Sequence, residues 1–232
     1  MNTIHFENID STNTYLKNNY QSLDDQTFVS ADNQTCGKGR NTRTWISEEK
    51  KNLLFSLLLK NNLEHYQDIS IISAYAIIKV LEQYGLKDLM IKWPNDIYVK
   101  DSKICGILLE GISKEKLECL IIGVGLNVNQ KTFAGDYIVL PTSMSLQLNK
   151  DINIDILKKD IYDSLIDKLN SNENYYDVIK KYDYLINKDV YVLINNKKEK
   201  VKVIGINEDY SLKIILNNTE LNINSSEISF HI

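Results

Sequence analysis

Proline, cysteine and long apolar runs are all scarce in this chain of 232 residues. Its two prolines, Pro94 and Pro141, exclude a proline-rich linker. Its three cysteines are odd in number, lie far apart and form no Cys-x-x-Cys pair, so we expect reduced thiols and no metal site. No apolar run approaches the roughly 20 residues that cross a bilayer, so we expect no membrane span.

The chain also lacks an excess of positive charge, with 27 lysines and arginines against 31 acidic residues and a net charge of −4. Proteins that coat nucleic-acid backbones usually carry a strongly basic excess, so global nucleic-acid binding is disfavoured. The first ten residues lack the basic and apolar regions of a secretion signal. We therefore expect a soluble, cytoplasmic protein with no membrane association.

Most of the chain alternates between short strands and amphipathic helices. Ser11 can cap a helix through about Tyr20, and apolar residues from Ile69 recur at three- and four-residue spacing up to Gly85, a typical helix stop. Two further helices are expected at 155–169 and 174–184. Strands are expected at 27–32, 52–59, 90–92, 97–99, 104–112 and 117–128, the last four as an antiparallel meander. These patterns predict a sheet with helices covering one face.

The sequence pattern changes beyond about Ile186, from alternating strands and helices to short apolar runs. Short apolar runs at 190–194, 201–206, 212–216 and 221–223 are joined by asparagine pairs, and asparagine tolerates the backbone of tight turns. Some 45 residues of short strands are typical of a small barrel. We place a domain boundary near Asp183 to Lys188, which divides the chain into 1–185 and 186–232.

The segment from Gly37 to Trp45 (GKGRNTRTW) carries three cations within six positions and two glycines that let the backbone approach a ligand closely. Such a loop suits an anion. Taken alone, it is equally consistent with a solvated basic loop.

Two further segments are unusual. Lys92 to Asp96 (KWPND) places a lysine at the end of an apolar strand before a turn, where it can project into a cleft, although an ordinary turn with an exposed lysine also fits. Gly123 to Asn127 (GVGLN) puts two glycines in a buried strand, which indicates close packing against the backbone or a β-bulge. Ser11-Thr12-Asn13 offers hydroxyl and amide groups to a helix cap or to a polar ligand.

Taken together and in this order, these segments resemble biotin–protein ligases. The resemblance also includes Gln34 and the segment Lys103 to Glu110, and it covers most of the chain. It implies an α+β fold, in which a catalytic domain related to class II aminoacyl-tRNA synthetases, with a mixed sheet, occupies 1–185 and an SH3-like barrel occupies 186–232. Only ten residues precede Ser11, so we expect no N-terminal DNA-binding domain.

The resemblance implies a two-step reaction. Biotin and MgATP would give biotinyl-5′-adenylate and pyrophosphate, and a lysine of a biotin carboxyl carrier protein would then attack the adenylate. A carboxylate is a poor electrophile until adenylated, and the attack of one anion on another requires local positive charge. By the family pattern, Lys92 and Arg40 would be catalytic.

The same pattern implies the contacts of both substrates. Biotin would be bound by Ser11, Thr12, Asn13, Gln34, Gly37, Lys38, Gly39, Arg40, Lys92, Gly106, Gly125 and Leu126. ATP would be bound by Arg40, Arg43, Trp45, Lys92, Asn95 and Asn127. Exposed sheet edges also leave room for a homodimer.

Two residues depart from the family pattern: Lys38 stands where an arginine is frequent, and Thr42 where a glycine is frequent. The second change puts the kinetics of the loop in question. Two alternatives remain open. One is a lipoate–protein ligase or octanoyltransferase of the same fold group. The other is a non-catalytic nucleic-acid-binding module that uses Lys197, Lys198, Lys200 and Lys202, residues that also fit the solvated end of a hairpin.

Overall fold

The computed structural model describes residues 2–40, 43–61, 63, 66–135, 137, 139–194, 197–224 and 230–231. Its strands are β1 (Thr3–Ile9), β2 (Phe28–Gln34), β3 (Asn52–Leu59), β4 (Leu89–Lys92), β5 (Asp96–Val99), β6 (Ser102–Ser113), β7 (Leu117–Asn127), β8 (Asp189–Ile194), β9 (Lys197–Ile206), β10 (Leu212–Leu216), β11 (Thr219–Ile223) and β12 (Phe230–His231). Its helices are α1 (Thr12–Asn19), α2 (Tyr66–Gln83), α3 (Met144–Leu148), α4 (Ile154–Asn170), α5 (Tyr176–Ile179) and the 3-10 turn Lys180–Tyr182.

A mixed seven-stranded sheet forms the larger part of the molecule, in the order β1-β2-β3-β7-β6-β5-β4. β1 and β2 run parallel, and every other neighbouring pair is antiparallel. The meander predicted from 90 to 128 is confirmed as β4 to β7. The prediction of an α+β fold with a mixed sheet is likewise confirmed.

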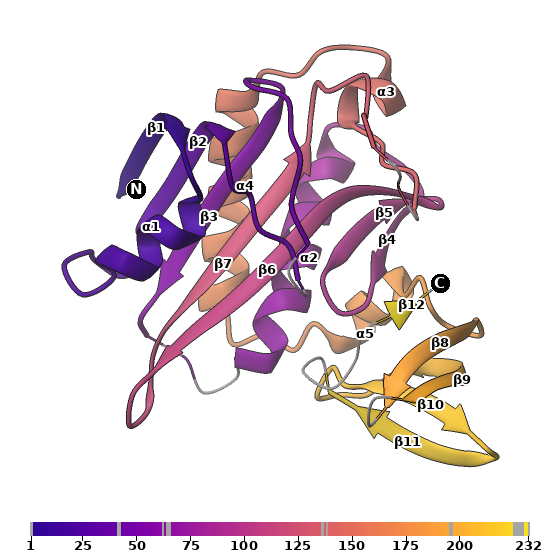
Figure 1. Ribbon diagram of the computed structural model, residues 1–232. Helices are drawn as coiled ribbons and strands as arrows, with labels where there is room; N and C mark the ends of the chain where they lie inside the picture. The colour runs from indigo at the N-terminus through magenta and orange to yellow at the C-terminus, as the bar shows by residue number, and fades with distance from the viewer. Residues whose placement is uncertain are drawn as a thin grey trace.

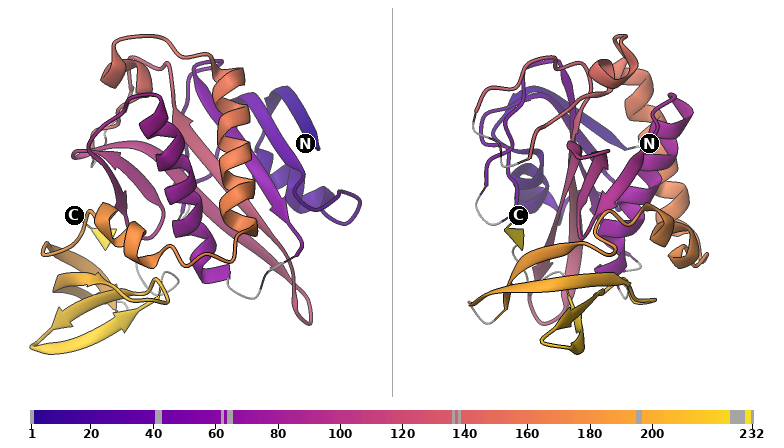
Figure 2. Two further views of the ribbon diagram at one scale, coloured as in Figure 1. Left: turned by 180° about the vertical axis from the view of Figure 1, so that it is seen from behind. Right: turned by 90° about the vertical axis from the view of Figure 1, so that its right-hand side faces the viewer.

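Helices cover both faces of this sheet (Figures 1 and 2). The long helices α2 and α4 pack side by side on one face, as predicted. The short helix α1 lies on the other face, where Leu16 packs against Val29, Leu58 and Ile121. The prediction of a single covered face was therefore incomplete, because the crossover between two parallel strands places α1 on the opposite side.

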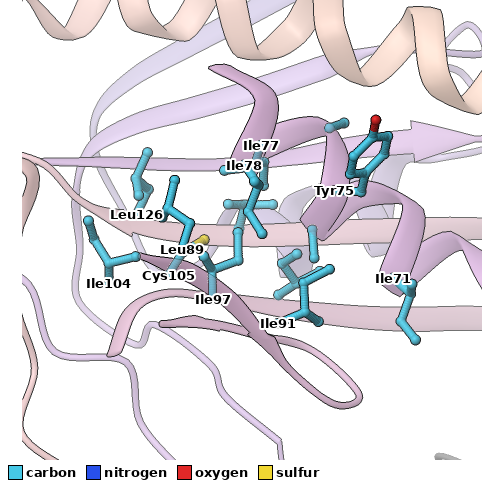
Figure 3. Packing of buried hydrophobic residues seen from close by; sticks show 14 of the residues in the cluster. Ile71, Tyr75, Ile77, Ile78, Leu89, Ile91, Ile97, Ile104, Cys105 and Leu126 are labelled. Carbon is cyan, nitrogen blue, oxygen red and sulfur yellow. The ribbon is translucent and has the colours of Figure 1, made fainter. Parts of the chain in front are cut away.

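The core between α2 and the sheet follows from the helical spacing seen in the sequence. Ile77 and Ile78 are fully buried, and in Figure 3 they face Leu89, Ile97 and Leu126 of the sheet strands. The helix ends as predicted: Gly85 has φ +99°, and the amide of the next residue, Leu86, donates to Leu81 O at 3.1 Å. Glycine is favoured there because a Cβ would be strained in the left-handed conformation.

A second, five-stranded antiparallel sheet follows the larger one, in the order β11-β10-β9-β8-β12. Its apolar residues join the core of the larger sheet in one buried cluster. Trp93 Nε1 donates to Tyr210 O, in the turn between β9 and β10, at 2.8 Å and so ties the two sheets together. Tyr184 N donates to Ile91 O at 3.0 Å and holds the segment that leads to β8 against β4. The predicted turn at Asn195–Asn196 lies outside the described residues.

Some elements differ from the sequence prediction. The helix expected at 174–184 is only one turn of α-helix, Tyr176–Ile179, followed by a 3-10 turn. β1 and α3 were not predicted. None of the helices in the described part of the chain is long and apolar enough to cross a membrane.

Phe28 provides a test of the packing under α4. Its ring is fully buried, stacks on Phe55 at 4.6 Å and meets Tyr162 edge-on at 5.5 Å. We expect Phe28→Ala to lower the free energy of unfolding by about 3–5 kcal/mol, because the cavity cannot collapse between sheet and helix. Urea denaturation measures this loss.

Ile156→Ala is the matched control, since Ile156 lies on α4 with 57% of its surface exposed. It should change the free energy of unfolding by no more than about 0.5 kcal/mol. Equal losses in the two variants would contradict the packing described here.

Candidate active site

A cavity of about 600 Å³ lies over the α1 face of β6 and β7. Its walls come from the start of α1, the end of β2, the loop from Lys38 to Ile46, the turn between β4 and β5, and the segment that follows β7. Fourteen of the sixteen residues predicted as site residues line it: Ser11, Thr12, Asn13, Gln34, Lys38, Gly39, Arg40, Arg43, Trp45, Lys92, Asn95, Gly106, Gly125 and Asn127.

The other two predicted residues, Gly37 and Leu126, do not line the cavity. Leu126 is fully buried and points into the core on the α2 face (Figure 3), because neighbouring strand residues face opposite sides of a sheet. Gly37 lies at the base of the basic loop, where its carbonyl accepts from Trp45 N at 2.9 Å. Thr42, the departure from the family pattern, lies outside the described residues.

The basic loop folds back on itself as a hairpin, with Lys38 bridged to Thr44 and Gly39 N donating to Arg43 O at 2.7 Å. The hairpin carries Trp45 onto the sheet. A Cβ built on Gly125 would lie 2.4 Å from the indole ring, and one on Gly106 would lie 2.9 Å from it. These two glycines face each other across β6 and β7, so together they form a flat seat for the ring.

The prediction that something packs closely on the backbone at Gly123 to Asn127 is therefore confirmed. Trp45 covers Gly125, and the amide of Asn13 covers Gly123, where a Cβ would lie 2.2 Å from Asn13 Oδ1. Only residues without a Cβ allow these contacts.

The turn between β4 and β5 holds Lys92 and Asn95. The Asn95 side chain donates to Ile107 O at 2.7 Å and accepts from Arg40 Nη1 at 3.3 Å, so it fixes the turn to β6 and steadies the arginine. Lys92 donates to Tyr98 Oη at 3.2 Å and is only 8% exposed. Its partial burial places an ammonium group at the inner end of the cavity.

Positive charge is concentrated in this cavity. Five cations line it (Lys38, Arg40, Arg43, Lys92 and Lys103), and among the described lining residues Asp96 carries the one carboxylate. The pKa of Lys92 is lowered to about 8, chiefly by burial and also by the charges of Lys103, Arg43 and Lys188, while Asp96 opposes the shift. Burial also lowers the pKa of Arg40. An anion bound here would relieve the repulsion among these groups.

Sequence reasoning did not single out Lys103 or Asp96 as site residues. Lys103 Nζ lies 2.8 Å from Asp96 Oδ1, close enough for an ion pair although without hydrogen-bond geometry, and 5.5 Å from the centre of the Trp45 ring. Both residues stand inside motifs that the sequence does display. What the sequence lacked was the pairing of β5 with β6, which brings positions 96 and 103 together.

Aromatic residues after β7 were also missed. Phe133 and Tyr137 line the cavity and meet edge-on with ring centres 6.5 Å apart. Their segment pairs with β6, because Lys103 N donates to Leu140 O at 3.1 Å and Lys103 O accepts from Thr142 N at 2.9 Å. No periodic pattern marks this segment in the sequence, so only its aromatic content could have drawn notice.

The opposite end of the cavity is uncharged and polar. It begins at Ser11, whose hydroxyl accepts from Thr14 N at 3.4 Å and caps α1 as predicted. Thr12 N donates to Gln34 Oε1 at 2.8 Å, which ties the helix start to the end of β2. The cavity thus has hydrogen-bonding groups at one end and cations at the other.

The lysines of β9 lie away from this cavity and are partly engaged. Lys200 pairs with Asp189 at 3.1 Å, and Lys198 lies over the ring of Tyr191 at 4.6 Å. These contacts agree with the solvated hairpin interpretation. Among the described residues there is no group of three or more histidine, cysteine or acidic side chains that could hold a metal ion.

Comparison with known proteins gives one family match and several relatives. Residues 5–127 match the model of the biotin/lipoate A/B protein ligase family. The bifunctional ligase/repressor BirA of Bacillus subtilis is 35% identical over 132 residues, which are 55% of this chain and 41% of that protein. BirA of Escherichia coli is 33% identical over 123 residues, 52% of this chain and 38% of that protein. The chain therefore spans about two fifths of the length of these relatives.

Among solved structures, the chain is similar to the biotin protein ligase from Aquifex aeolicus in complex with biotin and ATP. The two share 27% identity with a TM-score of 0.87, over 99% of this chain and 98% of the other. The similarity thus includes both sheets.

The seat of Trp45 can be tested without any ligand. In a Trp93→Phe background Trp45 is the one remaining tryptophan of the two. Adding Gly125→Ala should push the indole off the sheet, because the new Cβ would lie 2.4 Å from the ring. We expect a red shift of the tryptophan emission as the ring becomes solvated.

Gly111→Ala in the same background is the control, since its Cβ would meet the tips of two leucine side chains, Leu117 at 3.1 Å and Leu120 at 3.5 Å, and not Trp45. It should leave the emission unchanged. An unshifted spectrum for Gly125→Ala would place Trp45 elsewhere.

Proposed function

The chain belongs to the biotin/lipoate A/B protein ligase family, and we propose that it is an ATP-dependent biotin–protein ligase. One observation carries the proposal: a single cavity combines an uncharged polar end, a floor of glycines and a cluster of five cations. Biotin has the matching parts in the same order, namely a ureido ring, an apolar chain and a carboxylate. The volume of about 600 Å³ is in the usual range for small-molecule sites.

In the first step, an oxygen of the biotin carboxylate attacks the α-phosphorus of MgATP. A carboxylate–phosphorus bond forms, the bond to the bridging oxygen breaks, and pyrophosphate leaves with that electron pair. Both reactants are anions, so catalysis depends on fixed positive charge around the reacting atoms. We assign that charge to Lys92 and Arg40, and we add Lys103 because it stands beside the glycine floor.

In the second step, the amine of a lysine on a biotin carboxyl carrier protein attacks the carbonyl carbon of biotinyl-5′-AMP. The amide bond forms, AMP leaves, and the amine loses a proton. An enclosed site protects the adenylate from water during the interval between the steps. The hairpin that carries Trp45 is suited to cover the adenylate.

We assign the ring end of biotin to Ser11, Thr12, Asn13 and Gln34, and its chain to the backbone of Lys38 and Gly39 and to the wall formed where Trp45 rests on Gly106 and Gly125. Arg43, Trp45, Asn95 and Asn127 would stand on the nucleotide side. Gly37 and Leu126 would act from outside the cavity, Gly37 by shaping the hairpin and Leu126 by supporting β7 from the core.

We further propose that residues 1–185 form the catalytic domain, related to class II aminoacyl-tRNA synthetases, and that residues 186–232 form an SH3-like barrel. The separate five-stranded antiparallel sheet supports this division. We place the activity in the cytoplasm. The three cysteines, Cys36, Cys105 and Cys119, are free thiols, and thiols stay reduced in that compartment.

Intact-mass measurement tests the proposal. Incubation with biotin, MgATP and a biotin carboxyl carrier domain should add the mass of one biotin to the carrier. Lys92→Ala should slow biotin-dependent exchange of pyrophosphate into ATP by about 100-fold or more while the protein stays folded, because one preorganised charge is lost.

Lys87→Ala is the matched control, since Lys87 is exposed and stands outside the cavity. It should exchange pyrophosphate at the rate of the unaltered protein. Transfer of lipoate in place of biotin would reassign the substrate within the family, and no transfer of either would refute the proposal.

The pKa of Lys92 predicts a pH dependence. Since that pKa is lowered to about 8, raising the pH through 8 removes the charge that binds the anionic substrates. We expect kcat/KM for exchange to fall above about pH 8, because this parameter reports the free enzyme.

Lys92→Arg should remove this fall in kcat/KM above about pH 8, because a guanidinium stays protonated at alkaline pH. A fall near pH 8 that persists in the arginine variant would assign the titration to another group.

A further inference from the structure

Two polar side chains beside the cavity have no part in the function proposed above. Ser56, on β3, is fully buried, and Glu110, on β6, is partly buried. Neither lines the cavity. Both are hydrogen-bonded to the residues at the start of α1 that do line it, Thr12 and Asn13.

Glu110 determines which way the Asn13 amide faces. Asn13 Nδ2 donates to Glu110 Oε2 at 2.7 Å, and a carboxylate oxygen can only accept. Asn13 Oδ1 must therefore face the other way, towards Ser56 Oγ, 2.5 Å away. The amide also lies directly against the backbone of Gly123, so it has little room to turn.

This orientation of the Asn13 amide determines where the hydroxyl protons of Ser56 and then of Thr12 point. Asn13 Oδ1 can only accept, so the Ser56 proton points to it. The 2.6 Å contact between Ser56 and Thr12 then requires the Thr12 hydroxyl to donate to Ser56. Gln34 Oε1, at 3.1 Å from Thr12 Oγ1, is the weaker competitor for that proton and already accepts from Thr12 N at 2.8 Å.

We infer that Glu110 and Ser56 are positioning residues that select the ring of the substrate. They direct the hydroxyl proton of Thr12 towards Ser56, away from the cavity, and leave the hydroxyl oxygen as an acceptor for a ligand in the cavity. The acceptor fits a ring that carries an N–H group, such as the cyclic urea of biotin. It offers nothing to the dithiolane ring of lipoate or to the alkyl end of octanoate. The inference rests on the proposed function and explains how this chain would separate the substrates of its family.

The chain of hydrogen bonds from Glu110 through Asn13 and Ser56 to Thr12, called the relay below, can be tested by calorimetric titration with biotin. Glu110→Gln replaces an obligate acceptor by an amide that donates or accepts, and Ser56→Ala removes the middle of the chain. Each variant should weaken biotin binding about tenfold, the value of one well-placed hydrogen bond. Because the two residues act through one chain, the double variant should also lose about tenfold rather than about 100-fold.

Three further measurements separate positioning from damage to the fold. The dissociation constant for ATP should stay within about twofold in all variants, since the nucleotide end is untouched. The excess of lipoate needed to displace half of the bound biotin should fall about tenfold, in parallel with biotin affinity. Glu118→Gln, a carboxylate on β7 bonded to Tyr20 away from the cavity, should leave both ligands unaffected.

The outcomes distinguish this inference from the proposed function. If the unaltered protein binds no biotin, the proposed function fails and the relay fails with it. If it binds biotin and the variants bind equally well, only the relay is refuted. Additive losses in the double variant, or a parallel loss of ATP binding, would also refute it, because either result assigns Ser56 and Glu110 to separate or purely structural roles.

Discussion

Side chains lie directly on the backbone of β6 and β7, and this close approach governs the rest of the site. It requires three positions without a Cβ on one face of the antiparallel pair, Gly106, Gly123 and Gly125. Glycine weakens a strand interior, so the pair must be held by its neighbours. β3 pairs with β7 along its whole length, and the opposite face of both strands is packed into the main core. The sheet can therefore tolerate a surface of glycines on which the side chains of Trp45 and Asn13 rest.

The charged side chains of the cavity, like its glycines, are unfavourable for folding by themselves. Five cations around one carboxylate repel each other, and burial adds to the cost for Lys92 and Arg40, whose pKa values are both lowered. Folding alone gains nothing from this arrangement. A bound polyanion would reverse the sign of these interactions. Under the proposed function, relief of this repulsion would contribute binding free energy for the nucleotide and would stabilise the charge of the transition state.

Much of this arrangement is predictable from the sequence, and the exceptions have physical causes. Strand β3, helix α2 and the meander carry strong apolar patterns and were predicted. β1 was missed because its seven residues are mostly exposed at the sheet edge, so burial leaves little pattern. The helix at 174–184 is broken where its residues turn to meet the second sheet. Leu126 was assigned to the cavity by its place in a motif, although strand alternation turns it into the core. Lys103 and Asp96 meet through strand pairing, which no local pattern encodes.

The turn between β4 and β5 shows why the second sheet matters to the site. Trp93 lines the cavity and donates to Tyr210 O, in the turn between β9 and β10 of the second sheet, while Pro94 O accepts from Ser70 Oγ of α2 at 3.1 Å. Asn95 joins the same turn to β6 and to Arg40. The short turn is therefore bonded to four separate parts of the chain, and Lys92 and Asp96 stand at its two ends. A site that acts through fixed charges needs such over-determined supports, because displacement by about 1 Å can cost about 100-fold in rate. Under the proposed function, the second sheet would contribute to catalysis by holding the turn, although none of its described residues lines the cavity.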